Sequence, residues 1–267
     1  MATSELHEQI AAARAYEDFF VPSLFQQWPP VLAKAAHVAP GMRVLDVACG
    51  TGVLARELMA HVGTSGSVVG LDVMPGMLEV AKQIAPSIDW KQGTAEALPF
   101  SDQSFDVVVS QFGLMFFPDR IKSLREMLRV LTPGGRLAVA VWGSLDSIPA
   151  IADEVALLER VAGRAAADAL RAPFVLGNKS ELELLAREAG VGAPIVNTST
   201  GTARFPSIRS LVEADLRGWL PVMGVVLQEE TIQGVLAEAD RDLGAYADES
   251  GRAVFSVSAH VLSGTKS

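Results

Sequence analysis

The sequence predicts an α/β protein with a doubly wound, mostly parallel seven-stranded sheet and helical cap insertions. Apolar runs of strand length alternate with helical patterns from residue 41 to residue 142. The first run leads directly into a glycine-rich turn, and the run 105–110 lacks polar alternation, as expected of a strand covered on both faces. We therefore divide the chain into an N-terminal helical cap (1–40), an alternating α/β core (41–143) and a third part (144–267) that adds cap helices and completes the sheet.

The core elements follow one another with short connections. In chain order we expect strand 43–47, helix 53–61, strand 67–72, a helix from residue 75, strand 88–92, strand 105–110, helix 119–131 and strand 136–142. Pro75 suits the first turn of its helix. The helix 119–131 places Ile121, Leu124 and Leu128 on one face, which predicts packing on the sheet. The sequence Thr-Pro-Gly-Gly at 132–135 then ends the helix and reverses the chain.

The flanking segments are less regular. Residues 5–38 are expected to form helical pieces broken at Val21-Pro22 and at Trp28-Pro29-Pro30, because proline disfavours helix at the residue before it. After the core we expect helical segments 148–169, 180–189, 207–220 and 229–246, and strands 194–203 and 253–262. Ser180 and Glu183 have the spacing of a capping box.

Composition excludes several classes of function. The chain has 267 residues with 31 acidic and 22 basic ones, a net charge of −9, which is the wrong sign for a nucleic-acid surface. Its single cysteine, Cys49, excludes an internal disulfide and a zinc site built from several thiolates, so we predict no metal site and a cytoplasmic location. No segment approaches the ~20 apolar residues that span a bilayer.

The segment VLDVACGTGVLA (44–55) is the main functional motif. Gly50, Gly52 and Ala55 have the G-x-G-x-x-A spacing of a dinucleotide site, where N–H groups bind pyrophosphate. Asp46 precedes this turn, and a carboxylate within ~4 Å of a positive centre contributes roughly 4 kcal/mol at an effective dielectric of 20, whereas it repels a diphosphate. The motif therefore favours a cationic ligand. S-adenosylmethionine, with an ammonium, a sulfonium and no phosphate, fits this requirement.

Two further motifs extend the predicted cofactor site. Asp72 ends the second strand, 20 residues after Gly52, where a carboxylate accepts hydrogen bonds from ribose hydroxyls; NAD would use the same acid. The segment GTAEALPF (93–100) places Thr94, Ala95 and Glu96 just past the third strand, where an adenine ring would lie.

The series VLDVACGTG, LDVMPGML, GTAEALPF, SFDVVVSQFGLMFF and RVLTPGGRLAVAVW resembles the S-adenosylmethionine-dependent methyltransferases with a Rossmann-like fold. Within them it is most similar to the group that includes ubiquinone and menaquinone biosynthesis enzymes and bacterial natural-product methyltransferases. The resemblance implies a set of cofactor contacts: Asp46, Ala48, Gly50 and Gly52 at the methionine part, Asp72 at the ribose diol, Val73 and Met77 over the adenine, the Ala95 N–H at its ring, Thr94 and Glu96 near its amino group, and Gln111 beside the methyl group. The family usually has Asp where this chain has Thr94.

The methyl acceptor is expected to be a small, partly apolar molecule, because the cap segments are apolar and poor in basic residues. Tyr16, Phe116, Trp142 and Trp219 are the predicted substrate-wall residues. Oxygen, nitrogen and carbon stay open as the methylated atom, and methylation of a quinone-type ring carbon is one alternative. A catalytically silent S-adenosylmethionine-binding module and an NAD-dependent oxidoreductase are alternatives of other classes.

No catalytic base is evident from the sequence. Cys49 is expected to be structural, because it lies in a tight turn with no histidine nearby in sequence. His61 and His260 are expected at the surface or in packing, whereas His7 and Tyr16 belong to helices that could fold over the cofactor. We therefore expect catalysis mainly by positioning the acceptor for in-line displacement.

Overall fold

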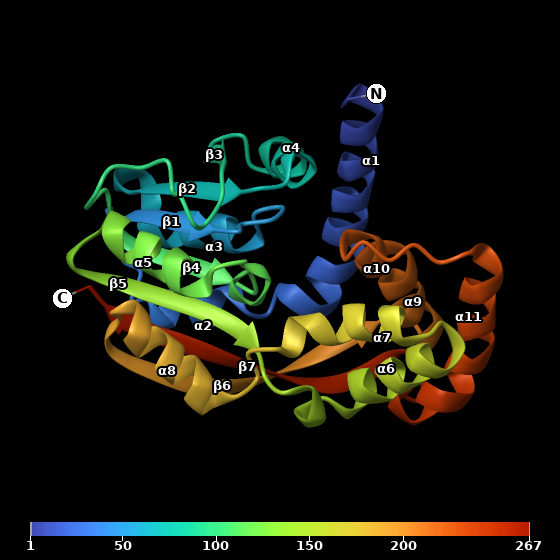
Figure 1. Ribbon diagram of the computed structural model, residues 1–267. Helices are drawn as coiled ribbons and strands as arrows, with labels where there is room; N and C mark the ends of the chain where they lie inside the picture. The colour runs from blue at the N-terminus through green and yellow to red at the C-terminus, as the bar shows by residue number, and fades with distance from the viewer. Residues whose placement is uncertain (1, 267) are drawn as a thin grey trace.

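One seven-stranded sheet, flanked by helices, organises the computed structural model, which describes residues 2–266 (Figure 1). The strand order is β3-β2-β1-β4-β5-β7-β6; β1 to β5 are parallel, and β7 runs antiparallel to both of its neighbours. The strands are β1 Arg43–Val47, β2 Ser67–Asp72, β3 Asp89–Gln92, β4 Phe105–Gln111, β5 Leu131–Trp142, β6 Gly192–Phe205 and β7 Ala253–Thr265. The predicted fold class is confirmed.

Helices account for most of the remaining chain. The α-helices are α1 Ala2–Ala15, α2 Pro29–Ala35, α3 Val53–Val62, α4 Pro75–Ile84, α5 Arg120–Val130, α6 Pro149–Val161, α7 Arg164–Arg171, α8 Lys179–Ala189, α9 Ile208–Ala214, α10 Leu220–Val222 and α11 Glu229–Leu243. Two π-helices, η1 Tyr16–Phe25 and η6 Asp215–Trp219, continue α1 and α9. Among residues 2–266, no helix combines the length and apolar character needed to cross a bilayer.

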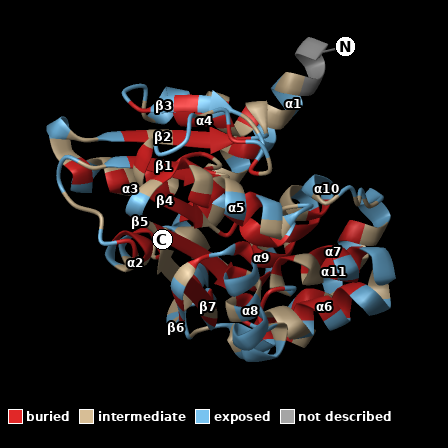
Figure 2. Cartoon of the chain, turned by 60° about the vertical axis from the view of Figure 1, so that its left-hand side comes forward, coloured by how far each residue is buried: buried red, intermediate tan, exposed pale blue. Residues whose placement is uncertain are grey.

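The core lies around the central strands, which are buried along most of their length (Figure 2). In β1 and β4 nearly every side chain is enclosed, as the apolar runs predict. Full burial of one Val or Leu side chain contributes about 1.5–3 kcal/mol, so packing holds the carboxyl ends of these strands in fixed positions.

The N-terminal segment differs from the prediction at Pro22. The expected break at Val21-Pro22 is wrong, because the helix continues through Pro22 as the π-helix η1 and ends with a bond from the Gln26 N–H to the Val21 carbonyl. A proline ring clashes with the carbonyl one α-turn earlier, and the wider i→i+5 turn moves that carbonyl away. The second expected break is found, since α2 begins at Pro29.

Two helix boundaries after the core also differ. Asn178, not Ser180, caps α8: its side-chain oxygen accepts from the Ser180 and Glu181 N–H groups. The expected continuous helix 148–169 is split into α6 and α7, because Gly163 has φ +91°, a left-handed value that a helix excludes.

A long hairpin connects the sheet to the cap. β6 and β7 pair along their whole length, but only residues 259–265 of β7 pair with β5. The free stretch of the hairpin extends beneath the cap helices α6, α7, α9 and α11 (Figure 1). It carries Phe205, Phe255 and Val257 to the cavity described next.

Candidate cofactor and substrate cavity

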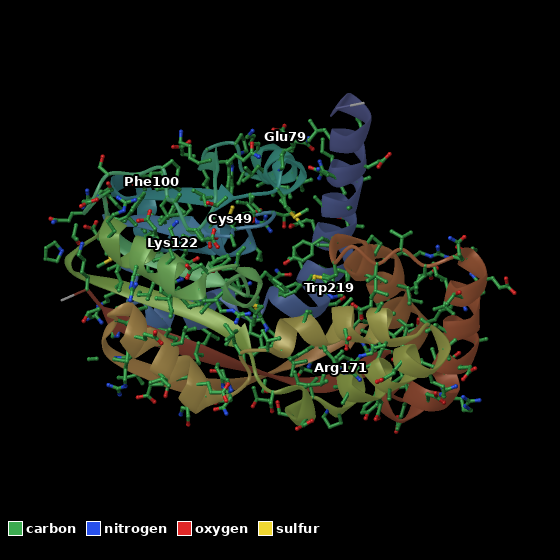
Figure 3. All side chains as sticks on the ribbon, viewed as in Figure 1. Cys49, Glu79, Phe100, Lys122, Arg171 and Trp219 are labelled. Carbon is green, nitrogen blue, oxygen red and sulfur yellow. The ribbon has the colours of Figure 1, made fainter. Side chains whose placement is uncertain are left out.

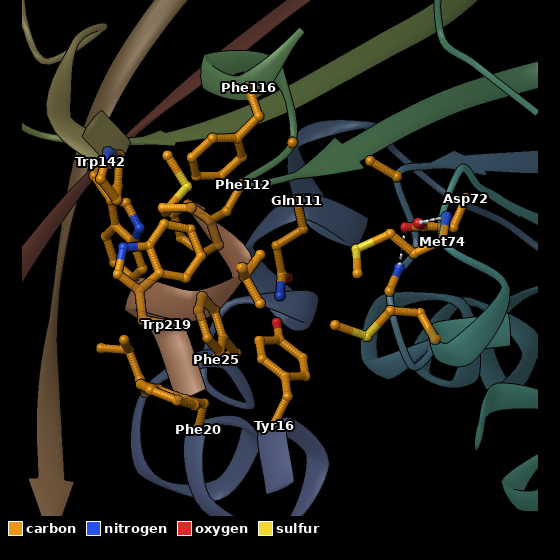
Figure 4. A pocket seen from close by; sticks show the side chains of 18 of the residues that line it. Tyr16, Phe20, Phe25, Asp72, Met74, Gln111, Phe112, Phe116, Trp142 and Trp219 are labelled. Atoms are coloured by element: carbon orange, nitrogen blue, oxygen red, sulfur yellow. Dashed lines mark hydrogen bonds between the residues drawn. The ribbon is translucent and has the colours of Figure 1, made fainter. Parts of the chain in front are cut away.

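A cavity of about 700 Å³ lies where the parallel strands end, between the sheet and the cap. Its size is in the range of small-molecule sites, and the carboxyl ends of parallel strands are where open α/β sheets bind ligands. One side consists of residues at or just after the ends of β1, β2 and β3. The other is walled by aromatic side chains from η1, β5, η6 and the 3-10 helix η3 (Leu114–Phe116) (Figure 4). Figure 3 shows Cys49 in the turn after β1 and Trp219, which lines the second side, near the cap helices.

The glycine turn after β1 has an unusual run of left-handed backbone. Ala48, Gly50 and Gly52 have φ of +58°, +55° and +89°. The turn is held by its own N–H groups: Cys49 N–H donates to the Leu71 carbonyl at 3.0 Å, Gly50 N–H to Asp72 Oδ2 at 2.8 Å, and Gly52 N–H to the Cys49 carbonyl at 2.9 Å. These three donors are therefore engaged within the protein and do not face a ligand.

Asp72 joins the ends of two strands at the cavity wall. Its Oδ2 accepts from Gly50 and its Oδ1 accepts from the Met74 N–H at 2.9 Å (Figure 4). Burial raises the pKa of Asp72, and these backbone hydrogen bonds lower it in part. Each carboxylate oxygen has a second lone pair, so the fixed carboxylate can still accept from a bound hydroxyl.

Two of the predicted cofactor residues, Asp46 and Gly52, do not line the cavity. Asp46 is fully buried behind the turn, and neither carboxylate oxygen has a hydrogen-bond partner. Burial, together with the nearby charge of Asp72, raises the pKa of Asp46 well above the ordinary range. The expectation that Asp46 faces the ligand is thus corrected: the strand end turns it into the core.

Gly52 is required for packing. A Cβ at this position would lie 2.4 Å from the Trp90 ring, which packs beneath the turn, and the same ring would lie 2.3 Å from a Cβ on Gly70. The positive φ of Gly52 adds a backbone reason for glycine. Sequence spacing assigned this residue to the ligand, but its contacts are with the core.

The other predicted cofactor residues lie together in the cavity wall. They are Ala48, Gly50, Asp72, Val73, Met77, Thr94, Ala95, Glu96 and Gln111. Glu96 Oε1 and Gln111 Oε1 are buried acceptor atoms without a hydrogen-bond partner in the protein. Because such atoms cost free energy when left unpaired, they indicate a ligand that carries hydrogen-bond donors. Met74, which sequence analysis did not select, also lines this wall.

The N-terminal segment is fastened over the glycine turn. Glu17 accepts from the Thr51 hydroxyl at 2.5 Å and from Arg56 Nη2 at 2.7 Å. The neighbouring Tyr16 ring lies 4.0 Å from the position of a Cβ on Gly50, and Figure 4 shows its hydroxyl pointing toward Gln111. Burial and the charges of nearby carboxylates raise the pKa of Tyr16, so its hydroxyl keeps its proton.

The four predicted substrate-wall residues, Tyr16, Phe116, Trp142 and Trp219, all line the cavity. Phe116 and Trp219 lie 5.4 Å apart between ring centroids, and the Trp219 indole N–H donates to the Ala169 carbonyl of α7.

Phe112 supports this wall from the end of β4. Its ring stacks on the Trp142 ring with 3.8 Å between ring centroids, and its backbone has a φ of +57°. Strained backbone of this kind is found most often at active sites and ligand clamps, which supports a ligand-binding role for this cavity.

The lining residues that the sequence did not predict include Phe20, Phe25 and Asp215. Phe20 and Phe25 face the cavity because η1 is a π-helix, whose wider turn changes which side chains share a face. Asp215 is a single acid in an apolar segment, and no motif marks it.

The cavity wall has an acidic character. Asp72, Glu96 and Asp215 are among its lining residues, and the lining residues within the described chain include no Lys, Arg or His. The histidine expected in the last strand is a packing residue: His260 is hydrogen-bonded to Thr198 and to the Gly177 carbonyl. The wall therefore favours a cationic or donor-rich ligand over a diphosphate.

Comparisons with known proteins identify relatives of this chain. Residues 15–150 match the model of the ubiE/COQ5 methyltransferase family. A demethylmenaquinone methyltransferase of Renibacterium salmoninarum is 48% identical over 115 residues, which are 43% of this chain and 47% of the relative. The ubiquinone/menaquinone biosynthesis C-methyltransferase of Ectopseudomonas mendocina is 40% identical over 139 residues, 50% of this chain and 54% of the relative. The chain thus spans about half the length of the curated relatives it matches.

A solved structure shares the fold. Phosphoethanolamine N-methyltransferase 2 of Haemonchus contortus, in complex with S-adenosyl-L-methionine, has a TM-score of 0.60 and 19% identity to this chain. The alignment covers 96% of this chain and 57% of that structure.

Proposed function

Because the chain belongs to the ubiE/COQ5 methyltransferase family, we propose that it transfers a methyl group from S-adenosylmethionine to a small, partly apolar acceptor held under the cap. The observation that carries this proposal is the engagement of the glycine turn by Asp72. In a dinucleotide site the N–H groups of this turn bind a diphosphate, whereas here the Gly50 N–H is taken by a carboxylate. A phosphate at this position would lack the Gly50 donor and would be repelled by the Asp72 carboxylate.

The residues present fit the proposed cofactor. We propose that Asp72 accepts from the ribose hydroxyls, that Val73 and Met77 cover the adenine, and that the Ala95 N–H meets its ring. The unpaired acceptors Glu96 Oε1 and Gln111 Oε1 support this arrangement, since the cofactor carries amino and ammonium donors. Ala48 and Gly50 border the methionine part, and Thr94 lies at the adenine edge.

S-adenosylmethionine supplies a methyl group on a sulfonium, and that reactivity belongs to the cofactor. The protein aligns the acceptor and excludes water; alignment alone contributes roughly 7–11 kcal/mol in well-oriented reactions. Phe112 stacked on Trp142 forms a rigid floor at the end of β4, and Phe116 with Trp219 forms the facing wall. These rings define a flat apolar space beside the proposed cofactor half.

We propose an aromatic ring of the quinone type, in its reduced hydroxylated form, as the acceptor. The flat aromatic walls support it, and the names of the relatives include demethylmenaquinone and ubiquinone/menaquinone C-methyltransferases. The experiment incubates the protein with S-adenosylmethionine and 1,4-dihydroxynaphthalene under reducing conditions and follows S-adenosylhomocysteine. Methylated product supports the proposal. Cofactor binding without turnover on this ring, on phenols or on amines would favour a silent binding module.

A further inference from the structure

Two neighbouring carboxyl groups, Asp215 and Glu154, lie at the cap side of the cavity. Asp215 begins η6, is 6% exposed and lines the cavity, whereas Glu154 lies fully enclosed behind it on α6. Neither Glu154 oxygen has a donor group of the protein within reach. Two neighbouring carboxylates repel each other when both are charged, so the pair is stabilised when one of them holds a proton.

The proton belongs mainly to Glu154. Burial and the charge of Asp215 raise the pKa of Glu154 well above its ordinary range. Burial raises the pKa of Asp215 to about 7, and a hydrogen bond from Glu154 holds it from rising further. Near neutral pH, Asp215 is therefore a partly ionised carboxylate that presents an acceptor atom to the cavity.

No cation neutralises this pair within the described chain. Other charged groups lie on η6, on α6 and on the helices α7 and α9, but each of them has a partner elsewhere. The pairs are Arg160 with Glu238 and Asp242, Arg171 with Glu159 and Asp168, Arg164 with Asp168, Arg209 with Gln233, Arg217 with Glu213 and Glu229, and Asp153 with Tyr246. An uncompensated buried carboxyl pair lowers stability, and a cavity-facing acid of this kind is typical of functional sites.

On the basis of the proposed methyl transfer, we propose that Asp215 accepts the proton of the acceptor's ring hydroxyl and that Glu154 is a positioning residue that hydrogen-bonds to it. The substrate class is then a hydroxylated aromatic ring. Trp219 lies one turn along η6 from Asp215, and with Phe116 it offers a flat surface to such a ring.

The chemistry balances without a further reactant. The O–H bond breaks, its proton goes to Asp215, and the electron pair left on oxygen is delocalised to the neighbouring ring carbon. That carbon forms a bond to the methyl group as the C–S bond breaks, and the electron pair of that bond goes to sulfur. The carbon then loses its hydrogen as a proton to solvent, and Asp215 returns its proton to the ring oxygen. The base thus raises the nucleophilicity of the acceptor without being consumed.

The test uses 2-naphthol, a hydroxylated ring, and its methyl ether 2-methoxynaphthalene, with binding followed by fluorescence from pH 5 to pH 8. In the unmodified protein the affinity for 2-naphthol is expected to rise at least fivefold across this range, as Asp215 ionises, and the ether is expected to show no such rise. Asp215→Asn is expected to remove the rise. The matched control Asp168→Asn, an exposed carboxyl on α7, is expected to retain it.

Glu154 provides a second readout. Glu154→Gln keeps a hydrogen-bond donor beside Asp215 and is expected to preserve the pH dependence of 2-naphthol binding. Glu154→Leu removes the donor and is expected to move the midpoint of that pH dependence to higher pH. Calorimetry with S-adenosylhomocysteine is expected to give equal affinity for all variants, which tests the proposed function separately from the base. Equal, pH-independent binding of 2-naphthol by the unmodified protein and by Asp215→Asn overturns the assignment, and so does failure of the unmodified protein to bind it.

Discussion

The backbone N–H of Gly50 donates a 2.8 Å hydrogen bond to Asp72 Oδ2, joining the glycine turn after β1 to the end of β2. This bond places a carboxylate where a dinucleotide site holds phosphate. It also fixes the carboxylate in one orientation, because the Met74 N–H binds the other oxygen. The proposed choice of cofactor follows from this relationship.

The first prediction concerns Asp72. Asp72→Ala is expected to weaken S-adenosylhomocysteine binding at least tenfold, because it removes the proposed ribose acceptor and leaves two backbone N–H groups unpaired. Asp72→Asn retains one acceptor oxygen and is expected to lose less affinity than Asp72→Ala. Asp89→Ala, at an exposed position of β3, is the control. Isothermal calorimetry measures the affinities, and unchanged binding by Asp72→Ala would contradict the ribose assignment.

The second prediction concerns Gly52. Gly52→Ala is expected to destabilise the protein by about 2–5 kcal/mol, because left-handed backbone costs a side chain about 1–2 kcal/mol and overpacking against Trp90 about 1–3 kcal/mol more. Gly134→Ala shares the positive φ but has open space around its Cβ, so it is expected to cost only the backbone part. Urea unfolding measures both variants. Equal losses would show that the Trp90 contact does not matter.

The third prediction concerns the N-terminal segment. Glu17→Ala removes the bonds to Thr51 and Arg56 and is expected to weaken S-adenosylhomocysteine binding three- to tenfold. Amide hydrogen exchange in residues 6–25 is expected to quicken, since η1 loses its attachment to the turn. Asp18→Ala, which changes the neighbouring exposed carboxyl, is the control. If exchange and affinity both stay at the level of the control, η1 is held by its aromatic contacts alone.

The fourth prediction concerns pH. The pKa of Asp215 is raised in the folded protein to about 7, so between about pH 4 and pH 7 the native state binds more protons than the unfolded chain, and stability falls as pH rises. From pH 5 to pH 7 this group contributes a fall of at most about 3 kcal/mol, at about 1.4 kcal/mol per pH unit. Asp215→Asn is expected to reduce that fall in the unfolding free energy measured with urea. A fall of the same size in the variant would assign it to other groups.

Much of the fold was predictable because short-range rules decide it. The apolar runs and the turn residues around β1, β2 and β4 place those strands to within about a residue, since periodicity and burial agree there. The helix through Pro22 was not predictable, because tertiary packing of the aromatic residues outweighs the local preference of proline. The α8 boundary was missed because two residues with capping side chains, Asn178 and Ser180, compete at its start.

The site was predictable where a motif fixes backbone geometry and less so where contacts decide. Spacing placed Asp72 at the end of the second strand, and the family resemblance placed Gln111 after the fourth; the sheet brings both to the cavity wall. The same spacing could not reveal that Asp46 turns into the core or that Gly52 packs on Trp90. Asp215 carries no sequence signal, because its proposed role depends on a neighbour 61 residues away in the chain, Glu154.

The most direct test of the account is calorimetric titration of the unmodified protein with S-adenosylhomocysteine and, separately, with NAD. We predict one site per chain for S-adenosylhomocysteine, with binding lost or weakened at least tenfold in Asp72→Ala, and no measurable heat from NAD. Saturable binding of NAD together with no binding of S-adenosylhomocysteine would contradict the proposed methyl-donor site.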